Sequence, residues 1–480
     1  MKKHNKIYFK SWAIIFTCLT VASMFFSCNL FNSNEKEITS FSFTNPPAVG
    51  IINESAKTIA VDVPEGTNIT SLAPVITLSP KATVSPSSGE AQNFANPVNY
   101  TVTAEDGSTA LYKVTVTVGG GGGGDVVTEL TNDMINTGDK ILAPGVYLVK
   151  SSLYLNGPNR LTISPGVTIK FANNISFSIN NNATLIAKGT EILPILFTSE
   201  RSGPQPGDWG NVVIGKCDGS ILEHCIFEYG GNSASWGMVT TSCEMTINDC
   251  IFRNSKFTGL WLYGTPGFVE FSGNQFINCA NSDVDQHPMR ADHLVELRNI
   301  GTGNIFNNTV QNKGILVMGS TLSRNVTLTK TNVPYYFQQE TRLDSESTVT
   351  LTIEPGVQIK MMQQARINVD KNGKLLAQGL PNDRIKIEGL VNQKGYWDYI
   401  VFHGNILEGN ILEYCDIING GRYTSGWEGA IYLYGTRADQ VAIKYCHIAK
   451  TLGYGIYFYG NSEAVLEGNT FEDCGMGNTN

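Results

Sequence analysis

The sequence has no surplus of basic residues. Its 480 residues include 34 Lys and Arg against 42 Asp and Glu, which gives a formal net charge of −8. Residues 1–27 hold four lysines and no acid, so the rest of the chain carries −8 − 4 = −12. An acidic body is not attracted to a phosphate backbone, which argues against nucleic acid as a partner. A polyanionic glycan would likewise need a local basic site or a bridging cation.

Long apolar runs are also missing, except at the start. The run WAIIFTCLTVASMFF has 15 residues, fewer than the roughly 20 that span a bilayer as a helix, and it follows a basic start. These features predict a signal peptide at 1–27. The FFSC that ends at Cys28 resembles a bacterial lipobox, although Phe25 stands where Leu is usual. The resemblance implies a lipid anchor on Cys28 and a tether at 28–37, and Asn29 favours the outer membrane or cell surface. The alternative is a simple secretory signal.

Short β-strand patterns fill 38–118, and Asp106 with Gly107 forms a hairpin-type turn. About 80 residues with strands at this spacing predict a small β-sandwich. The stretch VTAEDGSTALYKVTVTV resembles the closing strands of bacterial immunoglobulin-like modules, which implies a spacer or adhesion unit. Six glycines follow at 119–124, and they predict a flexible linker because ordering glycine loses much backbone entropy.

The remainder, 125–480, contains an internal duplication. LTISPGVTIKF at Leu161 matches LTIEPGVQIKM 190 positions later, and ILEHCIFEYGG at Ile221 matches ILEYCDIINGG at the same offset. Several matched segments in one order predict two related halves, about 145–280 and 335–475.

Each half has a finer period, near 25 residues, with short strand patterns separated by Gly, Asn and Asp turns and no amphipathic helix. This pattern predicts a parallel β-helix, because each rung leaves backbone groups unpaired until a neighbour stacks on it. The phrases resemble the right-handed parallel β-helix repeat (pectin-lyase-like) proteins that bacteria export. That superfamily includes pectate lyases, polygalacturonases and proteins without known activity. The expected fold class is therefore all-β, a β-sandwich followed by a right-handed parallel β-helix.

Cysteines recur at matched places of the two halves. They are Cys225, Cys250 and Cys279 in the first half and Cys415, Cys446 and Cys474 in the second. One cysteine per rung predicts a stack of buried free thiols, with rung-to-rung disulfides as the alternative. No CxxC pair or Cys/His cluster at ligand spacing is present, so we predict neither a metal site nor a cofactor.

The densest polar stretch, NSDVDQHPMRADH at 281–293, offers weak catalytic candidates. A β-helix lyase needs carboxylates that hold Ca²⁺ and a basic residue, and Asp283, Asp285 and Arg290 could supply them. Neither the NTD…DD…GHG…RIK set of polygalacturonases nor the WIDH phrase of pectate lyases is present. A solvated connecting turn is the alternative, and Ca²⁺ is expected only with lyase activity.

Tyrosines give the best functional signal. GAIYLYG and YGIYFYG lie 25 residues apart, and alternation places Tyr432, Tyr434, Tyr457 and Tyr459 on the outer face. In register, Tyr432 stands beside Tyr457 and Tyr434 beside Tyr459. Aromatic side chains of this kind can bind sugar rings, and the alternative is a cross-strand ladder that only stabilises the sheet.

The related first-half phrase GLWLYG places Trp261 and Tyr263 outward in the same way. We therefore predict a lipid-anchored surface protein that displays its β-helix for binding, most plausibly to glycan, without catalysis. The alternatives are a polysaccharide lyase or glycoside hydrolase that acts on the β-helix flank, and a structural envelope protein. The membrane would be reached through the lipid anchor only.

Overall fold

The computed structural model describes residues 33–118 without 55 and 64–65, and residues 127–480 without 216–218, 265–266, 281–286, 308–312 and 423–427. It forms two compact units, Met1–Gly124 and Asp125–Asn480. The predicted signal peptide, Cys28 and the glycine linker lie outside the described residues. Among the residues described, no helix has the length and apolar character needed to cross a membrane.

The first unit is the predicted β module. Its strands, in sheet order, are β4 (Pro74–Leu78), β1 (Ile38–Thr44), β2 (Pro47–Asn53), β3 (Thr58–Val63), β7 (Thr109–Val118), β6 (Val98–Thr103) and β5 (Thr83–Ser85), with a short 3-10 helix η1 (Ile69–Ser71). Neighbours run antiparallel except β3 and β7, which are parallel. Phe41, Phe43, Phe94 and Tyr100 pack edge to face in the core, with centroids 5.3–6.5 Å apart. The hairpin turn expected at Gly107 joins β6 to β7, with a positive φ of 84°.

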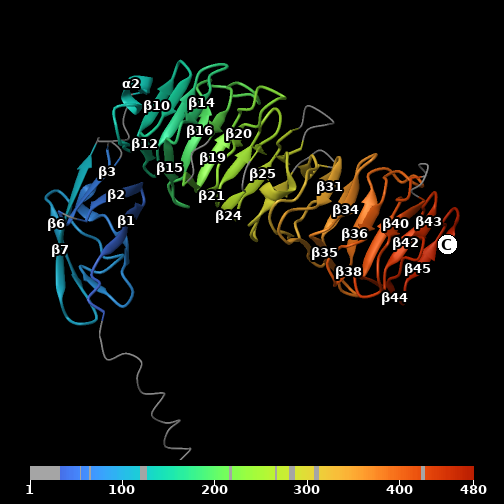
Figure 1. The fold of residues 1–480 in the computed structure, drawn as a ribbon. Coiled ribbons are helices and arrows are strands. Elements are labelled where there is room, and N and C mark those ends of the chain that lie inside the picture. Colours follow the sequence, from blue (N-terminus) through green and yellow to red (C-terminus); the bar gives the residue numbers. More distant parts are fainter. Residues whose placement is uncertain are drawn as a thin grey trace, which may run out of the picture. The chain divides into compact units, whose positions relative to one another are not determined.

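The second unit is the predicted parallel β-helix, in which the chain winds through successive rungs (Figure 1). One 13-stranded sheet runs through both halves. Its strands are β11 (Leu153–Asn156), β14 (Phe177–Asn180), β17 (Val212–Ile214), β20 (Val239–Thr241), β23 (Leu260–Leu262), β26 (Met289–Ala291), β28 (Ile315–Val317), β30 (Tyr335–Phe337), β33 (Gln358–Met361), β36 (Ile385–Gly389), β39 (Cys415–Ile418), β42 (His447–Ala449) and β45 (Thr470–Glu472).

Two further sheets complete the first half. The eight-stranded sheet contains β27 (Ile305–Asn307), β25 (Gln275–Ile277), β22 (Ile251–Arg253), β19 (Cys225–Glu228), β16 (Ile195–Ser199), β13 (Thr168–Phe171), β10 (Val146–Val149) and β8 (Thr128–Glu129). The six-stranded sheet contains β24 (Phe268–Ser272), β21 (Met245–Asn248), β18 (Ile221–Glu223), β15 (Thr184–Lys188), β12 (Arg160–Ile163) and β9 (Lys140–Leu142). The short helix α2 (Asn132–Ile135) precedes β9, and the 3-10 helix η2 (Leu294–Leu297) follows β26.

Two six-stranded sheets complete the second half. One contains β29 (Val326–Leu328), β32 (Val349–Ile353), β35 (Gly373–Gln378), β38 (Asn410–Glu413), β41 (Val441–Lys444) and β44 (Val465–Glu467). The other contains β31 (Glu340–Leu343), β34 (Arg366–Val369), β37 (Ile400–His403), β40 (Gly429–Tyr434), β43 (Tyr454–Tyr459) and β46 (Gly477–Thr479), and we call it the β31–β46 sheet.

In-register pairing builds the core as columns of like residues. Phe197, Phe227, Phe252, Phe276 and Phe306 stand opposite one another on five successive strands. Their rings stack with centroids 4.5, 5.5, 4.9 and 4.7 Å apart. Each such pair adds about 0.5–1.5 kcal/mol beyond the burial of its area. The column explains why a short strand with one inward aromatic residue is enough to hold a rung.

The sequence duplication appears in the structure as an equivalence of strands. Strands β11–β26 and β31–β46 follow the same order, so that each strand of the first half has its counterpart 20 strands later. The matched Trp209 and Trp397 are both buried, and their indole Nε1 groups donate to the backbone oxygens of Glu228 and Ile418, each at 2.8 Å. The two halves can therefore be compared position by position.

At β30 the 13-stranded sheet stops using one set of repeat strands and begins to use another. In the first half it contains β14, β17, β20 and β23, whose counterparts β34, β37, β40 and β43 lie in the β31–β46 sheet. Beyond β30 its strands are instead the counterparts of the eight-stranded sheet. Equivalent outer faces of the two halves therefore belong to different sheets.

A buried polar side chain closes the same turn in both halves, and this gives a test of the fold. Asn410 accepts a hydrogen bond from the Leu375 amide at 2.8 Å and donates to the Leu407 carbonyl at 2.7 Å. At the matched place, Ser220 accepts from the Leu185 amide at 3.1 Å. We expect Asn410→Ala to lower the free energy of unfolding by about 1–3 kcal/mol, because a buried amide loses its acceptor.

Asn410→Ser is the matched control, because serine performs this role in the first half. Urea denaturation should show a smaller loss for Asn410→Ser than for Asn410→Ala. Equal losses would mean that the acceptor is unimportant.

Candidate functional site

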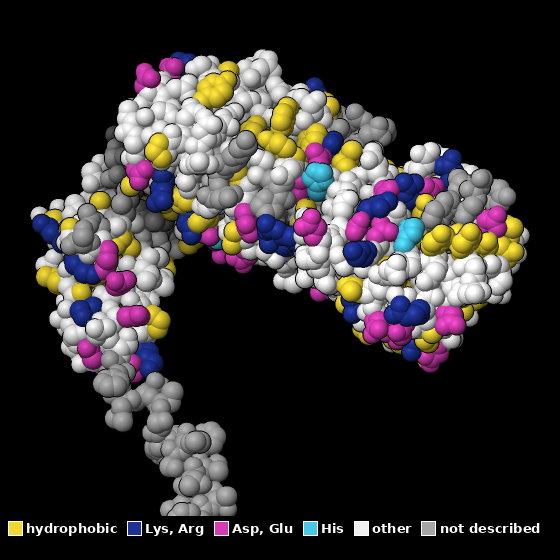
Figure 2. All heavy atoms as spheres, viewed as in Figure 1, with side chains coloured by type: hydrophobic (Ala, Val, Ile, Leu, Met, Phe, Trp, Pro, Cys, Tyr) yellow, Lys and Arg dark blue, Asp and Glu magenta, His cyan; other side chains and the backbone are white. Residues whose placement is uncertain are grey.

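The outward tyrosines lie on the β31–β46 sheet, in the register that the 25-residue offset predicts. Tyr432 pairs with Tyr457 and Tyr434 with Tyr459 across β40 and β43. The ring centroids are 5.2 Å apart in the first pair and 4.8 Å in the second. Figure 2 shows a band of hydrophobic side chains over this part of the molecule, next to a histidine and a group of charged side chains.

Exposure divides the four tyrosines into two classes. Tyr434 and Tyr459 are 43% and 49% exposed, and Tyr457 is half-buried. Tyr432 is only 2% exposed, because it packs with Tyr399 and Val401 of the preceding rung and with Tyr457. Burial raises the pKa of Tyr432 to about 12, and the neighbouring tyrosines add to the shift. The expectation that Tyr432 is a solvent-exposed contact is therefore wrong, and its place in this face is structural.

The stacking geometry determines what the exposed pair can offer a ligand. The rings of Tyr434 and Tyr459 are within 17° of parallel at 4.8 Å. Two coplanar rings side by side cannot approach so closely, so the rings overlap in an offset stack. Each ring covers part of its neighbour, and the pair presents ring edges and hydroxyl groups more than an open flat platform.

A cluster of charged side chains continues this outer face onto β31 and β34. Glu340 accepts a hydrogen bond from Arg342 at 2.8 Å and pairs with Arg366 at 2.5 Å. Arg342 also pairs with Asp370 at 3.1 Å, and Arg366 with Asp398 at 3.5 Å. These charges stand on successive rungs, so the register that stacks the tyrosines also brings the arginines and carboxylates together.

His403 joins the charged cluster to the tyrosines. Its Nε2 lies 3.5 Å from Asp370, and its ring centroid lies 6.0 Å from that of Tyr434, its partner on β40. Asn368, between the arginines, donates to Glu340 at 2.8 Å. The outer face thus runs without a break from charged groups through an imidazole to exposed tyrosines.

The net pKa shifts of the acids in this cluster have opposite directions. Burial raises the pKa of Asp370 and of Asp398, against the opposing effect of neighbouring cations. Burial also raises the pKa of Glu340, but hydrogen bonds from Arg366 and Arg342 outweigh it, and the net pKa lies below the ordinary value of 4.5. Glu340 is therefore the anion that the two arginines hold in place.

Asp370 and Asp398, the two acids of this face whose pKa is raised, are not arranged as a hydrolytic pair. Asp398 stands beside the start of β34, where its amide donates to Ala365, whereas Asp370 follows the end of that strand. Five residues at about 3.3 Å each separate the two places by roughly 16 Å. Glycosidases place their two carboxyl groups about 5–9.5 Å apart. This separation disfavours hydrolysis by Asp370 and Asp398 acting as a pair.

The first half offers an internal comparison for this face. By strand equivalence Ser152, Ser176 and Asn211 stand where the second half has Glu340, Arg366 and Tyr399. There the Ser176 amide donates to Ser152 Oγ, and the Asn211 amide donates to Ser176 Oγ. The fold therefore does not require charged or aromatic side chains at these places.

The other predicted residues have different surroundings. Arg290, on β26, stacks over Trp261, with its guanidinium carbon 3.6 Å from the ring centroid. Trp261 is consequently 8% exposed, which corrects the expectation of an open outward ring. Tyr263 is half-buried beside it. Asp283 and Asp285, proposed with Arg290 as catalytic candidates, lie outside the described residues.

The cysteines form pairs rather than columns of three. Cys225 stands opposite Cys250, and Cys415 opposite Cys446, by the register of their strands. Cys279 and Cys474 come at a later turn of the rung, opposite Ser255 and Thr451, so the predicted stack is wrong for them. The described cysteines are free thiols.

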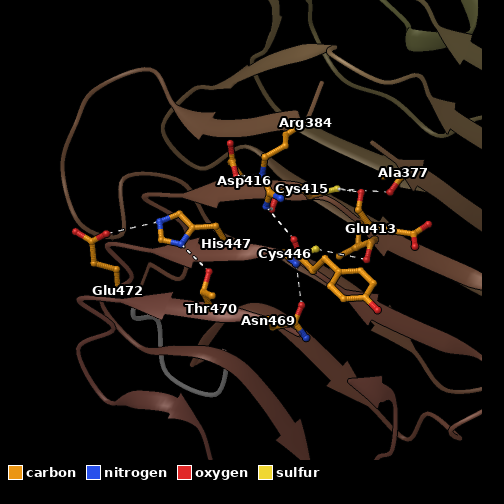
Figure 3. A network of polar contacts seen from close by, with 12 residues as sticks. Ala377, Arg384, Glu413, Cys415, Asp416, Cys446, His447, Asn469, Thr470 and Glu472 are labelled. Atoms are coloured by element: carbon orange, nitrogen blue, oxygen red, sulfur yellow. Dashed lines mark hydrogen bonds and ion pairs between the residues drawn. The ribbon is translucent and has the colours of Figure 1, made fainter. Parts of the chain in front are cut away.

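In the second half these cysteines belong to a network that joins neighbouring rungs (Figure 3). Arg384 donates to Asp416 at 2.6 Å and to the Cys415 carbonyl at 3.0 Å. The Cys446 amide donates to Asn469 at 2.9 Å. Burial raises the pKa of the Cys415 thiol well above its ordinary value. These contacts are structural. Among the described residues, no group of three or more His, Cys, Asp and Glu side chains is placed to hold a metal ion.

Comparison with known proteins supports both units of the fold. Residues 38–116 match a family model described as "SGBP, N-terminal". Residues 134–235 match a pectate-lyase like beta helix domain, and residues 400–479 match a right handed beta helix region. The chain is a right-handed parallel β-helix protein with an N-terminal immunoglobulin-like module.

Two solved structures each match about a fifth of the chain. A candidate glycoside hydrolase from Bacteroides thetaiotaomicron is 34% identical over 21% of this chain and 29% of its own, with a TM-score of 0.17. A candidate secreted protein from Bacteroides fragilis is 18% identical over 18% of this chain and 95% of its own, with a TM-score of 0.15. This chain thus spans under a third of the first of these structures. No curated protein matches it.

The charged cluster gives a prediction about pH. A carboxylate whose pKa is lowered by folding stabilises the protein above its unfolded pKa, near 4.5, and this stabilisation is lost as the pH falls through the folded pKa. We expect Glu340→Gln to lower the free energy of unfolding by about 1–3 kcal/mol at pH 7. The difference from wild type should shrink below pH 4.5 in urea denaturation series.

Glu129→Gln is the matched control, because Glu129 pairs with Lys150 at 3.5 Å with both side chains half exposed. Exposed pairs contribute about 0–1 kcal/mol. A Glu340 variant no less stable than the Glu129 variant would contradict the role given to the cluster.

Proposed function

We propose that this protein binds glycan at a cell surface, without catalysis, through the outer face of the β31–β46 sheet. One observation carries the proposal. The exposed pair Tyr434 and Tyr459 continues into a half-buried cluster of arginines and carboxylates that the equivalent first-half face lacks. The match of residues 38–116 to the N-terminal module of the SGBP family, the surface glycan-binding proteins, supports it.

The chemistry of this face suits a sugar chain. Tyrosine combines an apolar ring with a hydroxyl, so the exposed ring edges can contact a pyranose while the hydroxyl groups hydrogen-bond to it. Charged groups make hydrogen bonds about twice as strong as neutral ones, and Arg342 and Arg366 are already held in fixed positions by Glu340. A ligand therefore meets an ordered surface and loses little side-chain entropy on binding.

A glycan-cleaving enzyme is the second candidate. The observation in its favour is that burial raises the pKa of Asp370 and Asp398, as a general acid requires. Their separation along β34 disfavours hydrolysis by this pair. A polysaccharide screen scored for both retention and cleavage distinguishes the two candidates, and a lyase would release unsaturated products that absorb ultraviolet light.

The N-terminal part of the chain would serve attachment. A lipid on Cys28 would hold the protein to the outer membrane or cell surface. The immunoglobulin-like module and the glycines at 119–124 would then extend the β-helix from the membrane, which raises the effective concentration of its binding face near surface glycans.

The binding proposal predicts the effect of removing the exposed pair. Tyr434→Ala/Tyr459→Ala should reduce affinity for any polysaccharide that wild type retains by at least roughly tenfold, the equivalent of about 1.4 kcal/mol. Native affinity gels that contain starch, xylan, pectin, yeast mannan or β-glucan provide the measurement. Both side chains are nearly half exposed, so the unfolding temperature should change little.

Tyr154→Ala is the matched control, because Tyr154 is 51% exposed on the outer face of β11. It should bind as wild type does. Unchanged retention of the double variant would contradict the proposed site. A wild type retained by none of the polysaccharides would favour the structural envelope protein.

The anchor is tested separately. Cys28→Ser should move the protein from the membrane fraction to the soluble exported fraction, because the lipid is the only attachment proposed. Intact-mass spectrometry of the wild type should find a diacylglyceryl group on Cys28 as the first residue. An unmodified cysteine there would refute the anchor and leave the binding site unaffected.

A further inference from the structure

A second aromatic cluster lies in the first half, away from the face described above. Trp236 is 41% exposed, and its ring meets Tyr263 edge to face at 5.6 Å and Trp261 at 6.3 Å. In Figure 2 hydrophobic side chains gather over the region of β20 and β23. Tryptophan and tyrosine are enriched where proteins bind partners, so this cluster is a candidate binding surface.

Polar contacts hold the cluster in one arrangement. Asp292 accepts a hydrogen bond from the Trp261 indole at 3.0 Å and another from Arg290 Nε at 2.9 Å. The Arg290 guanidinium stacks over the Trp261 ring, with its carbon 3.6 Å from the ring centroid. The side chains of Arg290 and Asp292 keep 20% and 30% of their surface exposed. Partly exposed hydrogen-bonding groups therefore lie against Trp261, whose ring neighbours that of Trp236.

The duplication places this cluster at the counterpart of the tyrosine pair. Strand β23 corresponds to β43, so Trp261 corresponds to Tyr457 and Tyr263 to Tyr459. By the same register Trp236 corresponds to Glu428, so the exposed tryptophan belongs to the first half only. The outer faces of the two halves differ at other equivalent places, because the first half has serines where the second half has Glu340 and Arg366. Both halves nevertheless keep aromatic residues here.

We infer that the cluster of Trp236, Tyr263, Arg290 and Asp292 is a second glycan-binding site. The β-helix then binds polysaccharide at both sites, either as one chain that reaches both or as one chain at each. This inference rests on the proposed function, because it takes glycan as the ligand class. The two sites lie on different sheets, because β23 belongs to the 13-stranded sheet and β43 to the β31–β46 sheet. Along the β-helix, seven rung steps lead from β23 through the rungs of β26, β28, β31, β34, β37 and β40 to that of β43. Seven spacings of about 4.8 Å separate the sites by roughly 34 Å along the β-helix.

Two sites at this distance make binding depend on ligand length. A short oligosaccharide fills each site independently, whereas a long polysaccharide can engage both sites and gain avidity. Trp236 offers an exposed indole ring, which is larger than a tyrosine ring. The first-half site should therefore contribute the apolar contact, and the second-half site the hydrogen bonds to hydroxyl groups.

The test compares a first-half variant, Trp236→Ala/Tyr263→Ala, with the second-half variant Tyr434→Ala/Tyr459→Ala and with all four substitutions together. The probes are the soluble polysaccharides of the affinity gels and tetrasaccharides prepared from any that is retained. Isothermal titration with the tetrasaccharide should find two molecules per wild-type chain and one per chain for either double variant. On the parent polysaccharide each double variant should bind roughly 10–100-fold more weakly, and the quadruple variant not at all.

The outcomes separate this inference from the proposed function. One tetrasaccharide per wild-type chain, or wild-type polymer affinity in the Trp236 variant, overturns the second site and leaves the first proposal intact. If Tyr434→Ala/Tyr459→Ala keeps full affinity while Trp236→Ala/Tyr263→Ala loses it, the proposed site on the β31–β46 sheet is overturned. The Trp236 cluster is then the glycan-binding site. Absence of binding to every polysaccharide overturns both. Trp236 fluorescence, measured against Trp236→Phe, gives a second readout, because ligand at this site alone should quench it.

Discussion

Backbone hydrogen bonds between successive rungs hold equivalent residues about 4.8 Å apart, and every side chain inherits that spacing. Inside the β-helix the spacing equals the distance at which parallel rings pack, as in the five phenylalanines from Phe197 to Phe306. Outside, the same spacing stacks Tyr434 on Tyr459 and sets Glu340 beside Arg366. The core and the candidate site are therefore two results of a single register.

The register also explains why a dense charge cluster can exist on this surface. Half-buried ions are unfavourable unless each has a partner. Adjacent rungs supply the partners at fixed distances, so Arg342 and Arg366 share the anion of Glu340 while each reaches a second carboxylate. Such a surface is rigid before any ligand arrives. Rigidity of this kind is what distinguishes a recognition surface from a random scatter of charges.

Much of the architecture could be predicted from the sequence because the repeat is linear. The strand alternation, the two halves and the pairing of Tyr434 with Tyr459 all follow from spacing. The charged cluster was missed because Glu340, Arg366 and Asp398 lie 26–32 residues apart and look like isolated surface charges. Aligning the rungs, rather than the halves alone, would have brought them together.

Other features could not be read from the pattern. The burial of Tyr432 depends on Tyr399, which lies just before β37 and packs against Tyr432 from the neighbouring rung. Alternation predicts the direction of a side chain but not what lies over it. The place of Cys279 depends on the residues that separate it from β25. At β30 the 13-stranded sheet switches to a different set of repeat strands. This switch occurs in the irregular rungs between the halves, where the sequence has no repeat from which the strand pairing could be predicted.

That switch at β30 has an evolutionary consequence. A solenoid of this kind can lengthen or shorten by whole rungs without changing which way any strand faces, whereas a one-residue insertion within a strand reverses its inward and outward faces. The irregular segment between the halves is where such a change disturbs neither repeat. The distance between the two aromatic surfaces is therefore adjustable in steps of one rung, and related chains could match different ligands by changing the length of this segment alone.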